Sequence, residues 1–228
     1  MTDKKKNSIR QKIFFTFFGT YLLPENIVVI TPIRKIFFLL KKSFPIQEKT
    51  KGWWQRVVAK INSHLVTILK IPSGTNYIQN CLSVLNPKTI KILIFLGYCT
   101  SFSKEIMPGE IVIPHSSVSG KKEIRPFIPR RFPFPGNKKH KIALLHRLLL
   151  VIRKKTRAQL GDMETYFLYK FSHSKKIPVL AFLLVTDNPI FYPVYSLSIS
   201  QKKKIKSSLK KFPKLLREYI CKFLSHLK

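Results

Sequence analysis

The segment from Gly161 to Pro189 has the sequence GDMETYFLYKFSHSKKIPVLAFLLVTDNP, and its pattern decides the fold class. We expect a helix over Met163–Ser174 and a buried strand over Val179–Thr186, because the second run is apolar and ends in a turn sequence. A helix that leads into a buried strand is the repeating unit of α/β proteins. Glu164 and Asp187 lie at opposite ends of this unit, where an acid at a helix start and an acid past a strand can converge on one pocket.

The same alternation runs through much of the chain. Residues 27–30, 64–71, 91–96 and 110–114 are predicted strands, and residues 32–44, 76–85 and 140–155 are predicted helices. Residues 45–51 and 121–137 are predicted loops. The tail, residues 200–228, predicts an amphipathic helix that Pro213 kinks or splits. This order predicts a three-layer α/β/α sandwich around a mixed, mainly parallel sheet, formed by residues 1–228 as one domain.

The charge of the chain is strongly positive. Its 228 residues include 43 Lys and Arg against 10 Asp and Glu, a formal net charge of +33. Such a charge attracts polyanions, so nucleic acid or an anionic membrane surface is one interpretation. The alternative is a lysine-rich composition whose charge covers a solvated surface. The basic residues are scattered along the chain, with one dense run at Gln201–Lys211, which favours the second interpretation.

Cysteine and histidine usage indicates neither a metal site nor a disulfide framework. Cys81, Cys99 and Cys221 are far apart, and the six histidines form no HxxxH or HxxE pattern. We therefore predict no metal, no cofactor and a reducing, cytoplasmic location.

No apolar run is long enough to suggest stable membrane insertion; the longest are 92–96 and 179–185. Residues 4–24 are basic and then Phe-rich, but no small-residue cleavage site follows, so a secretory signal is not expected. The basic tail is expected to dock on its own core rather than lie on a membrane.

Two blocks of the opening segment carry a family resemblance. GDMET at Gly161–Thr165, followed by the strand that ends in TDNP at Thr186–Pro189, resembles the signature of the nucleoside phosphorylase superfamily, and most closely its AMP nucleosidase branch. Leu96–Cys99 and Gly109–Pro114 resemble two further elements at the same separation. The resemblance covers most of the chain, and it implies a homo-oligomer, because that superfamily is oligomeric.

The resemblance implies cleavage of the N-glycosidic bond between a purine and a ribose in a nucleotide or nucleoside. Asp187 would be the general acid that protonates the departing base, Glu164 would hold the ribose hydroxyls, and Met163 would pack against the sugar. Taken alone, Asp187 is a good turn residue and Glu164 a good first-turn acid for a helix dipole. Four more substrate-binding residues are implied in two turns: Gly74, Thr75, Cys99 and Thr100.

The chain departs from the family pattern where phosphate is bound. Family glycines fall on Pro72, Thr100 and Ser101, and an expected arginine falls on Ser119. Either other cations bind a 5′-phosphate, or the protein has lost activity and serves as a basic binding protein, for instance for nucleic acid. The candidate cations are Lys104, Lys121, Lys122, Arg125, Arg130 and Arg131.

Overall fold

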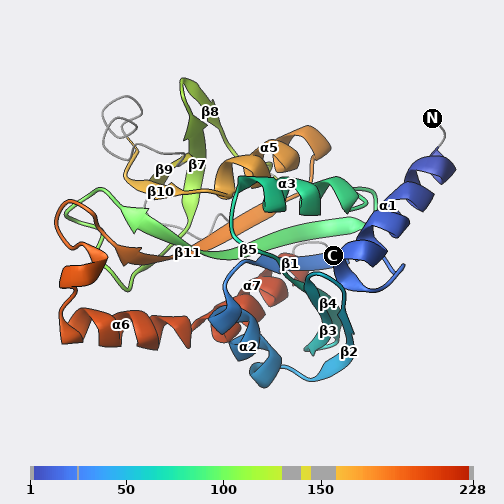
Figure 1. Ribbon diagram of the computed structural model, residues 1–228, viewed down its shortest axis with the longest axis horizontal. Helices are drawn as coiled ribbons and strands as arrows, with labels where there is room; N and C mark the ends of the chain where they lie inside the picture. The colour runs from blue at the N-terminus through green and yellow to red at the C-terminus, as the bar shows by residue number, and fades with distance from the viewer. Residues whose placement is uncertain (1–2, 25, 130–139, 145–157, 226–228) are drawn as a thin grey trace.

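A computed structural model describes residues 3–24, 26–129, 140–144 and 158–225 (Figure 1). The helices in this part of the chain are α1 (Asp3–Phe18), α2 (Arg34–Ser43), α3 (Thr75–Val84), α5 (Thr165–Lys175), α6 (Ile199–Leu209) and α7 (Phe212–Ser225), with a 3-10 turn, η1 (Val194–Ser196). The strands are β1 (Asn26–Thr31), β2 (Ile46–Lys51), β3 (Gln55–Ile61), β4 (His64–Lys70), β5 (Ile90–Ser101), β6 (Ile111–Val112), β7 (Pro114–Ser119), β8 (Lys122–Ile124), β9 (His140–Leu144), β10 (Leu160–Asp162) and β11 (Val179–Asp187).

The strands form one mixed sheet, and β5 is its central strand. The order is β2-β3-β4-β1-β5-β10-β9-β7-β8. Along one edge of β5, β1 pairs with its first half and β10 with its end; β11 pairs with the opposite edge, and β6 lies beside β11. The ladders β4–β1, β1–β5 and β5–β11 at the centre are parallel, whereas β2–β3, β3–β4 and β7–β8 toward the edges are antiparallel. The alternating pattern of the sequence therefore predicted the central sheet correctly.

Helices cover both faces of the sheet, as Figure 1 shows: α1, α3 and α5 lie on one face, and α2, α6 and α7 on the other. Alternate residues of the central strands face the two layers. In β11, Ala181 and Leu183 belong to the core cluster beneath α3 and α5, while Phe182 and Leu184 belong to the cluster beneath α2 and α7. Burial on both faces explains why this segment is almost wholly apolar.

The two ends of the described chain pack on this core. Phe14 and Phe18 of α1 are fully buried in the cluster that includes Trp54. The tail divides into α6 and α7 at residues 210–211, and Pro213 stands in the first turn of α7, where its missing N–H costs nothing. The predicted split is confirmed. Of the helices in the described ranges, none is long and apolar enough to cross a membrane.

Three secondary-structure predictions were wrong. Residues 121–137 are not a loop throughout, because Lys122–Ile124 forms β8 and pairs with β7. Residues 45–51 are not a loop, because Ile46–Lys51 pairs with β3 as an edge strand whose residues alternate between partly buried and exposed. Residues 140–144 are not helical, because β9 pairs with β7 on one side and β10 on the other. The rest of that predicted helix lies outside the described residues. The sequence reasoning also missed α1, β3 and β10, and it missed β7 beyond its first residue.

Candidate active site

The two halves of the opening segment meet on either side of Thr100. On one edge of β5, Asp187 of β11 is the partner of Thr100; on the other edge, Gly161 of β10 is its partner. Neighbouring strands lie about 4.8 Å apart, so the backbones at Gly161 and Asp187 are separated by roughly 10 Å. Asp162 follows directly after Gly161, and Glu164 is two residues farther on. The sheet thus brings together carboxylates from both blocks at the carboxyl end of β5.

Asp187 is half-buried at the end of β11, and its carboxylate takes no part in the following turn. Its Oδ1 accepts a 3.1 Å hydrogen bond from the neighbouring Thr186 hydroxyl. Asn188 forms the turn instead: its Oδ1 accepts from the N–H groups of Ile190 and Phe191, and its Nδ2 donates to Ser103 O at 2.9 Å. The turn role that the Asp-Asn-Pro sequence suggests therefore belongs to Asn188.

Glu164 likewise does not have the role of a simple helix cap. It is 4% exposed, and its Oε1 accepts a 2.7 Å hydrogen bond from Gly74 N, just before α3. The cap of α5 comes from Asp162, whose Oδ2 accepts hydrogen bonds from the N–H and the hydroxyl of Thr165. Glu164 is thereby free to join the start of α5 to the turn before α3.

Asp162 is a site residue that the sequence reasoning did not single out. It is 4% exposed, and its Oδ1 is buried without a hydrogen-bond partner. Burial and the nearby charge of Glu164 raise the pKa of Asp162 to about 8. Burial also raises the pKa of Glu164, although the hydrogen bond from Gly74 opposes this. The available signal was its place in GDMET, between a glycine and a second acid two residues on.

Cys99 lies among these carboxylates. Burial raises the pKa of its thiol, and the charges of Asp162 and Asp187 raise it further. Both carboxylates are therefore close enough to act on Cys99, which remains a protonated thiol rather than a nucleophile. On the next residue, the Thr100 hydroxyl donates to Asp187 O at 3.4 Å.

The other predicted site residues lie around this cluster. Gly74 has φ 121° and ψ 161°, a conformation open mainly to glycine, and Thr75 is the first residue of α3. Met163 stands between the two buried acids and is 41% exposed. In the part of the chain that the structure describes, no group of three or more His, Cys, Asp or Glu is arranged to hold a metal ion.

Comparison with known proteins identifies the fold. A scan against protein-family models and a search of curated proteins found no match. Among solved structures, the Campylobacter jejuni 5′-methylthioadenosine/S-adenosylhomocysteine nucleosidase is similar, with a TM-score of 0.69 and 12% identity over 86% of this chain and 99% of that one. The AMP nucleosidase of Bacteroides thetaiotaomicron has a TM-score of 0.66 and 17% identity over 93% and 99%. A futalosine hydrolase mutant of Helicobacter pylori has a TM-score of 0.66 and 10% identity over 86% and 99%. The chain therefore has the α/β fold of these nucleosidases, as the resemblance predicted.

Proposed function

We propose that this protein is an N-glycosidase that hydrolyses the bond between a purine and a ribose, and that AMP is its substrate. The observation that carries the proposal is the pairing of Thr100 with Asp187 on one side and Gly161 on the other. This pairing brings the half-buried Asp187 and the segment that carries the buried Glu164 to the carboxyl end of β5, and α/β folds bind their ligands at the carboxyl ends of their parallel strands. The fold shared with three nucleosidases supports it.

The chemistry assigns a different task to each carboxyl group. As the glycosidic bond breaks, electrons pass to the base and the ribose acquires oxocarbenium character. Asp187 donates a proton to the imidazole nitrogen of the departing base, which makes that base a better leaving group. Glu164 holds the ribose hydroxyls with the oxygen that Gly74 does not bind, and its negative charge stabilises the positive sugar. Water adds to the anomeric carbon and loses a proton, giving adenine and ribose 5-phosphate.

A 5′-phosphate needs a cation near the sugar, and Lys104 is the one we propose. Its Nζ lies 4.9 Å from the centre of the Phe191 ring. Phe191 belongs to the turn that follows Asp187 and is held by the side chain of Asn188. Arg125 is less suitable, because it is two residues from Phe127, which bridges to Pro178 before β11 begins. A strand of nine residues spans roughly 30 Å, so Arg125 lies near the wrong end of β11.

The remaining candidate cations lie farther from the cluster or cannot be placed. Lys121 and Lys122 are at the turn between β7 and β8, on the far side of β9 from β10. Arg130 and Arg131 are outside the described residues.

The test is release of free base by the purified protein from AMP, adenosine, methylthioadenosine and futalosine. We expect release from AMP, with a higher kcat/KM than for adenosine. Release from methylthioadenosine or futalosine alone would support the glycosidase activity but show that AMP is not the substrate. If none of the four compounds releases a base, the proposed activity is wrong.

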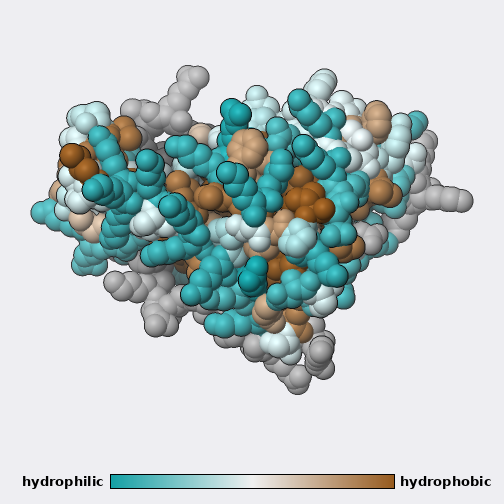
Figure 2. Space-filling model, turned by 90° about the horizontal axis from the view of Figure 1, so that it is seen from below, coloured by the Kyte–Doolittle hydropathy of each residue, from teal (hydrophilic) through white to brown (hydrophobic). Residues whose placement is uncertain are grey.

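A basic face favours nucleic-acid binding as a second candidate function. Figure 2 shows the face that carries α2, α6 and α7, where hydrophilic side chains surround smaller apolar patches. Within these three helices Glu218 is the one acid. The cations of the helices and of the link between α6 and α7 are Arg34, Lys35, Lys41, Lys42, Lys202, Lys203, Lys204, Lys206, Lys210, Lys211, Lys214, Arg217 and Lys222.

Salt dependence tests this second function. A protein that neutralises phosphates releases counterions, so its affinity for single-stranded RNA should fall steeply as salt increases. Replacing Lys202, Lys203 and Lys206 of α6 with glutamine should reduce the salt slope by about two, roughly 0.7 per lost contact. Binding that is undetectable, or that salt and these replacements leave unchanged, would dismiss it.

We also infer a homo-oligomer in a reducing, cytoplasmic setting. The inference on location comes from Cys81, Cys99 and Cys221, which are all free thiols. Sedimentation equilibrium of the purified protein tests self-association, and a monomer at all concentrations would refute it. Fractionation of cells that express the protein tests its location.

A further inference from the structure

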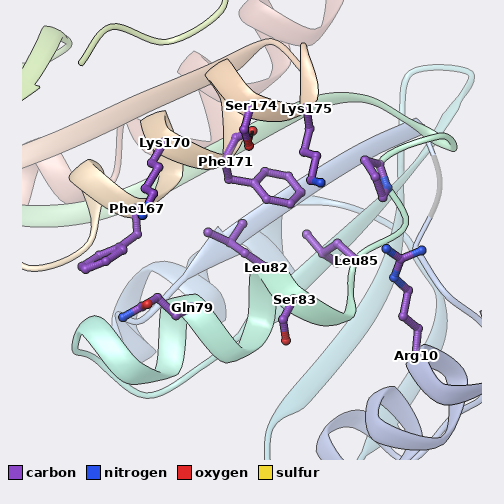
Figure 3. A pocket seen from close by; sticks show the side chains of 11 residues that line it. Arg10, Gln79, Leu82, Ser83, Leu85, Phe167, Lys170, Phe171, Ser174 and Lys175 are labelled. Atoms are coloured by element: carbon purple, nitrogen blue, oxygen red, sulfur yellow. Dashed lines mark hydrogen bonds between the residues drawn. The ribbon is translucent and has the colours of Figure 1, made fainter. Parts of the chain in front are cut away.

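A groove separate from the carboxylate cluster runs between α3 and α5 (Figure 3). Its volume is about 370 Å³. Leu82 of α3 and Leu85, which follows the end of α3, line it and are 5% and 1% exposed. Phe167 and Phe171 line it from α5 and are half-buried, packed against the same core cluster. The groove therefore has an apolar lining that belongs to the rigid core.

Cations stand at the rim of this lining. Arg10 of α1 and Lys175 at the end of α5 extend toward the same end of the groove, beside Leu85, while Lys170 lies near Phe167 at the other end (Figure 3). None of the described residues that line the groove is acidic. Among the ion pairs of the described residues, none involves these three cations. Within the described residues, the rim is thus positively charged and its cations form no ion pair.

The shape and charge together define a ligand class. A cleft of this volume is at the small end of the range that holds small molecules, which is about 300–1,000 Å³. An apolar lining favours burial of a hydrocarbon body at about 25 cal/mol per Å² of apolar surface. Arg10 and Lys175, which converge at one end, favour an anionic head group at that end.

We propose that this groove binds a small amphipathic anion, a carboxylate with an aliphatic or aromatic body. The body lies along Leu82 and Phe171, and the carboxylate lies between Arg10 and Lys175. The groove is separate from the proposed purine site, because neither Glu164 nor Asp187 lines it. The proposal does not depend on the proposed glycosidase activity, and its test measures binding alone.

The test compares three probes by isothermal titration calorimetry of the full-length protein. Octanoate has both the body and the charge, octan-1-ol has the body alone, and acetate has the charge alone. We expect octanoate to bind at least about tenfold more tightly than either of the others, since both interactions are needed. Equal affinity for octanoate and octan-1-ol, or for octanoate and acetate, would overturn the proposal.

Matched variants place the ligand. Ser83 is exposed on the rim, so Ser83→Trp should fill the groove and abolish octanoate binding without disturbing the core. The control is Asn80→Trp. Asn80 is exposed one turn earlier on α3 and does not line the groove, so this variant should bind octanoate as the wild type does. Arg10→Gln should weaken octanoate about tenfold, whereas Lys12→Gln, an exposed cation on the same helix outside the groove, should not. If both members of a pair behave alike, the ligand binds elsewhere and the proposal is wrong.

Discussion

The carboxylate of Glu164 accepts a 2.7 Å hydrogen bond from the backbone N–H of Gly74, a residue 90 positions earlier in the chain. This contact joins the starts of α3 and α5, the two helices that cover the same face of the sheet. It also fixes one oxygen of the carboxylate that we propose for sugar binding. Because the donor is a backbone group, its position depends on the conformation of Gly74 rather than on a side chain.

Replacement of Gly74 with alanine should therefore be costly. A Cβ at this position would meet only Tyr77 Cδ2 at 3.7 Å, an ordinary contact, so the cost is conformational rather than steric. With φ at 121° and ψ at 161°, we expect a loss of about 1–3 kcal/mol in the free energy of unfolding, measured by urea denaturation. The matched control is Gly120→Ala, at φ 59° with open space around it, which should cost about 1 kcal/mol. A Gly74→Ala protein as stable as the wild type would contradict the strained turn.

Asp187→Asn should remove the general acid and leave the fold intact. The amide keeps the size of the side chain and can still accept the hydrogen bond from Thr186. We expect kcat for base release from AMP to fall on the order of 100-fold or more, with stability within about 0.5 kcal/mol of the wild type. Glu105→Gln, an exposed acid on the neighbouring loop, is the control and should retain full activity. A fully active Asp187→Asn protein would exclude Asp187 as the acid.

Asp162 should make the stability of the protein depend on pH. Its pKa is about 8 in the folded protein, against about 3.9 for an unperturbed aspartate. The folded state holds this proton more tightly, so the stabilisation is complete below about pH 4 and is lost as the pH rises through about 8. Asp162→Asn stays neutral throughout. The Tm of the wild type should therefore fall more than that of Asp162→Asn between about pH 5 and pH 9, and parallel curves would contradict the raised pKa.

Lys104→Gln should weaken the binding of a nucleotide but not that of a nucleoside. If the ammonium group of Lys104 binds the 5′-phosphate, its loss should raise KM for AMP by roughly tenfold, about 1.4 kcal/mol, because charge-assisted hydrogen bonds contribute about 1.5–3 kcal/mol. The KM for adenosine, which has no phosphate, should not change. Lys91→Gln, an exposed cation at the start of β5, is the control. Equal effects on AMP and adenosine would assign the phosphate to another cation.

The strands and helices with strong apolar patterns were predictable, and those that depend on pairing were not. β1, β4 and β11 are apolar runs of β-branched and aliphatic residues, and the sequence marked them correctly. Ile46–Lys51 has a single large apolar residue, so nothing in its pattern suggests a strand; its pairing with β3 makes it one. His140–Leu144 has residues that suit a helix, and hydrogen bonds from β7 and β10 on either side override that preference.

The candidate site shows the same division. The GDMET and TDNP blocks are local patterns, so they pointed to Glu164 and Asp187 without any knowledge of the fold. The burial of Asp162 and its partnerless oxygen depend on neighbours from distant segments, and so do the opposing positions of Asp187 and Gly161 around Thr100. The roles of Asn188 in the turn and of Asp162 as the cap of α5 also became clear only from the structure.

The sequence by itself determined the α/β class and the buried central strands, because hydrophobic periodicity and turn chemistry depend on neighbouring residues. The acids worth testing came from the resemblance of the GDMET and TDNP blocks to a known family, which is also a local pattern. Only the tertiary structure decided which strands share β5, which carboxylates meet there, and that a cation-rimmed groove opens between α3 and α5. These features arise from contacts between residues far apart in the chain, and local sequence patterns carry no record of such contacts.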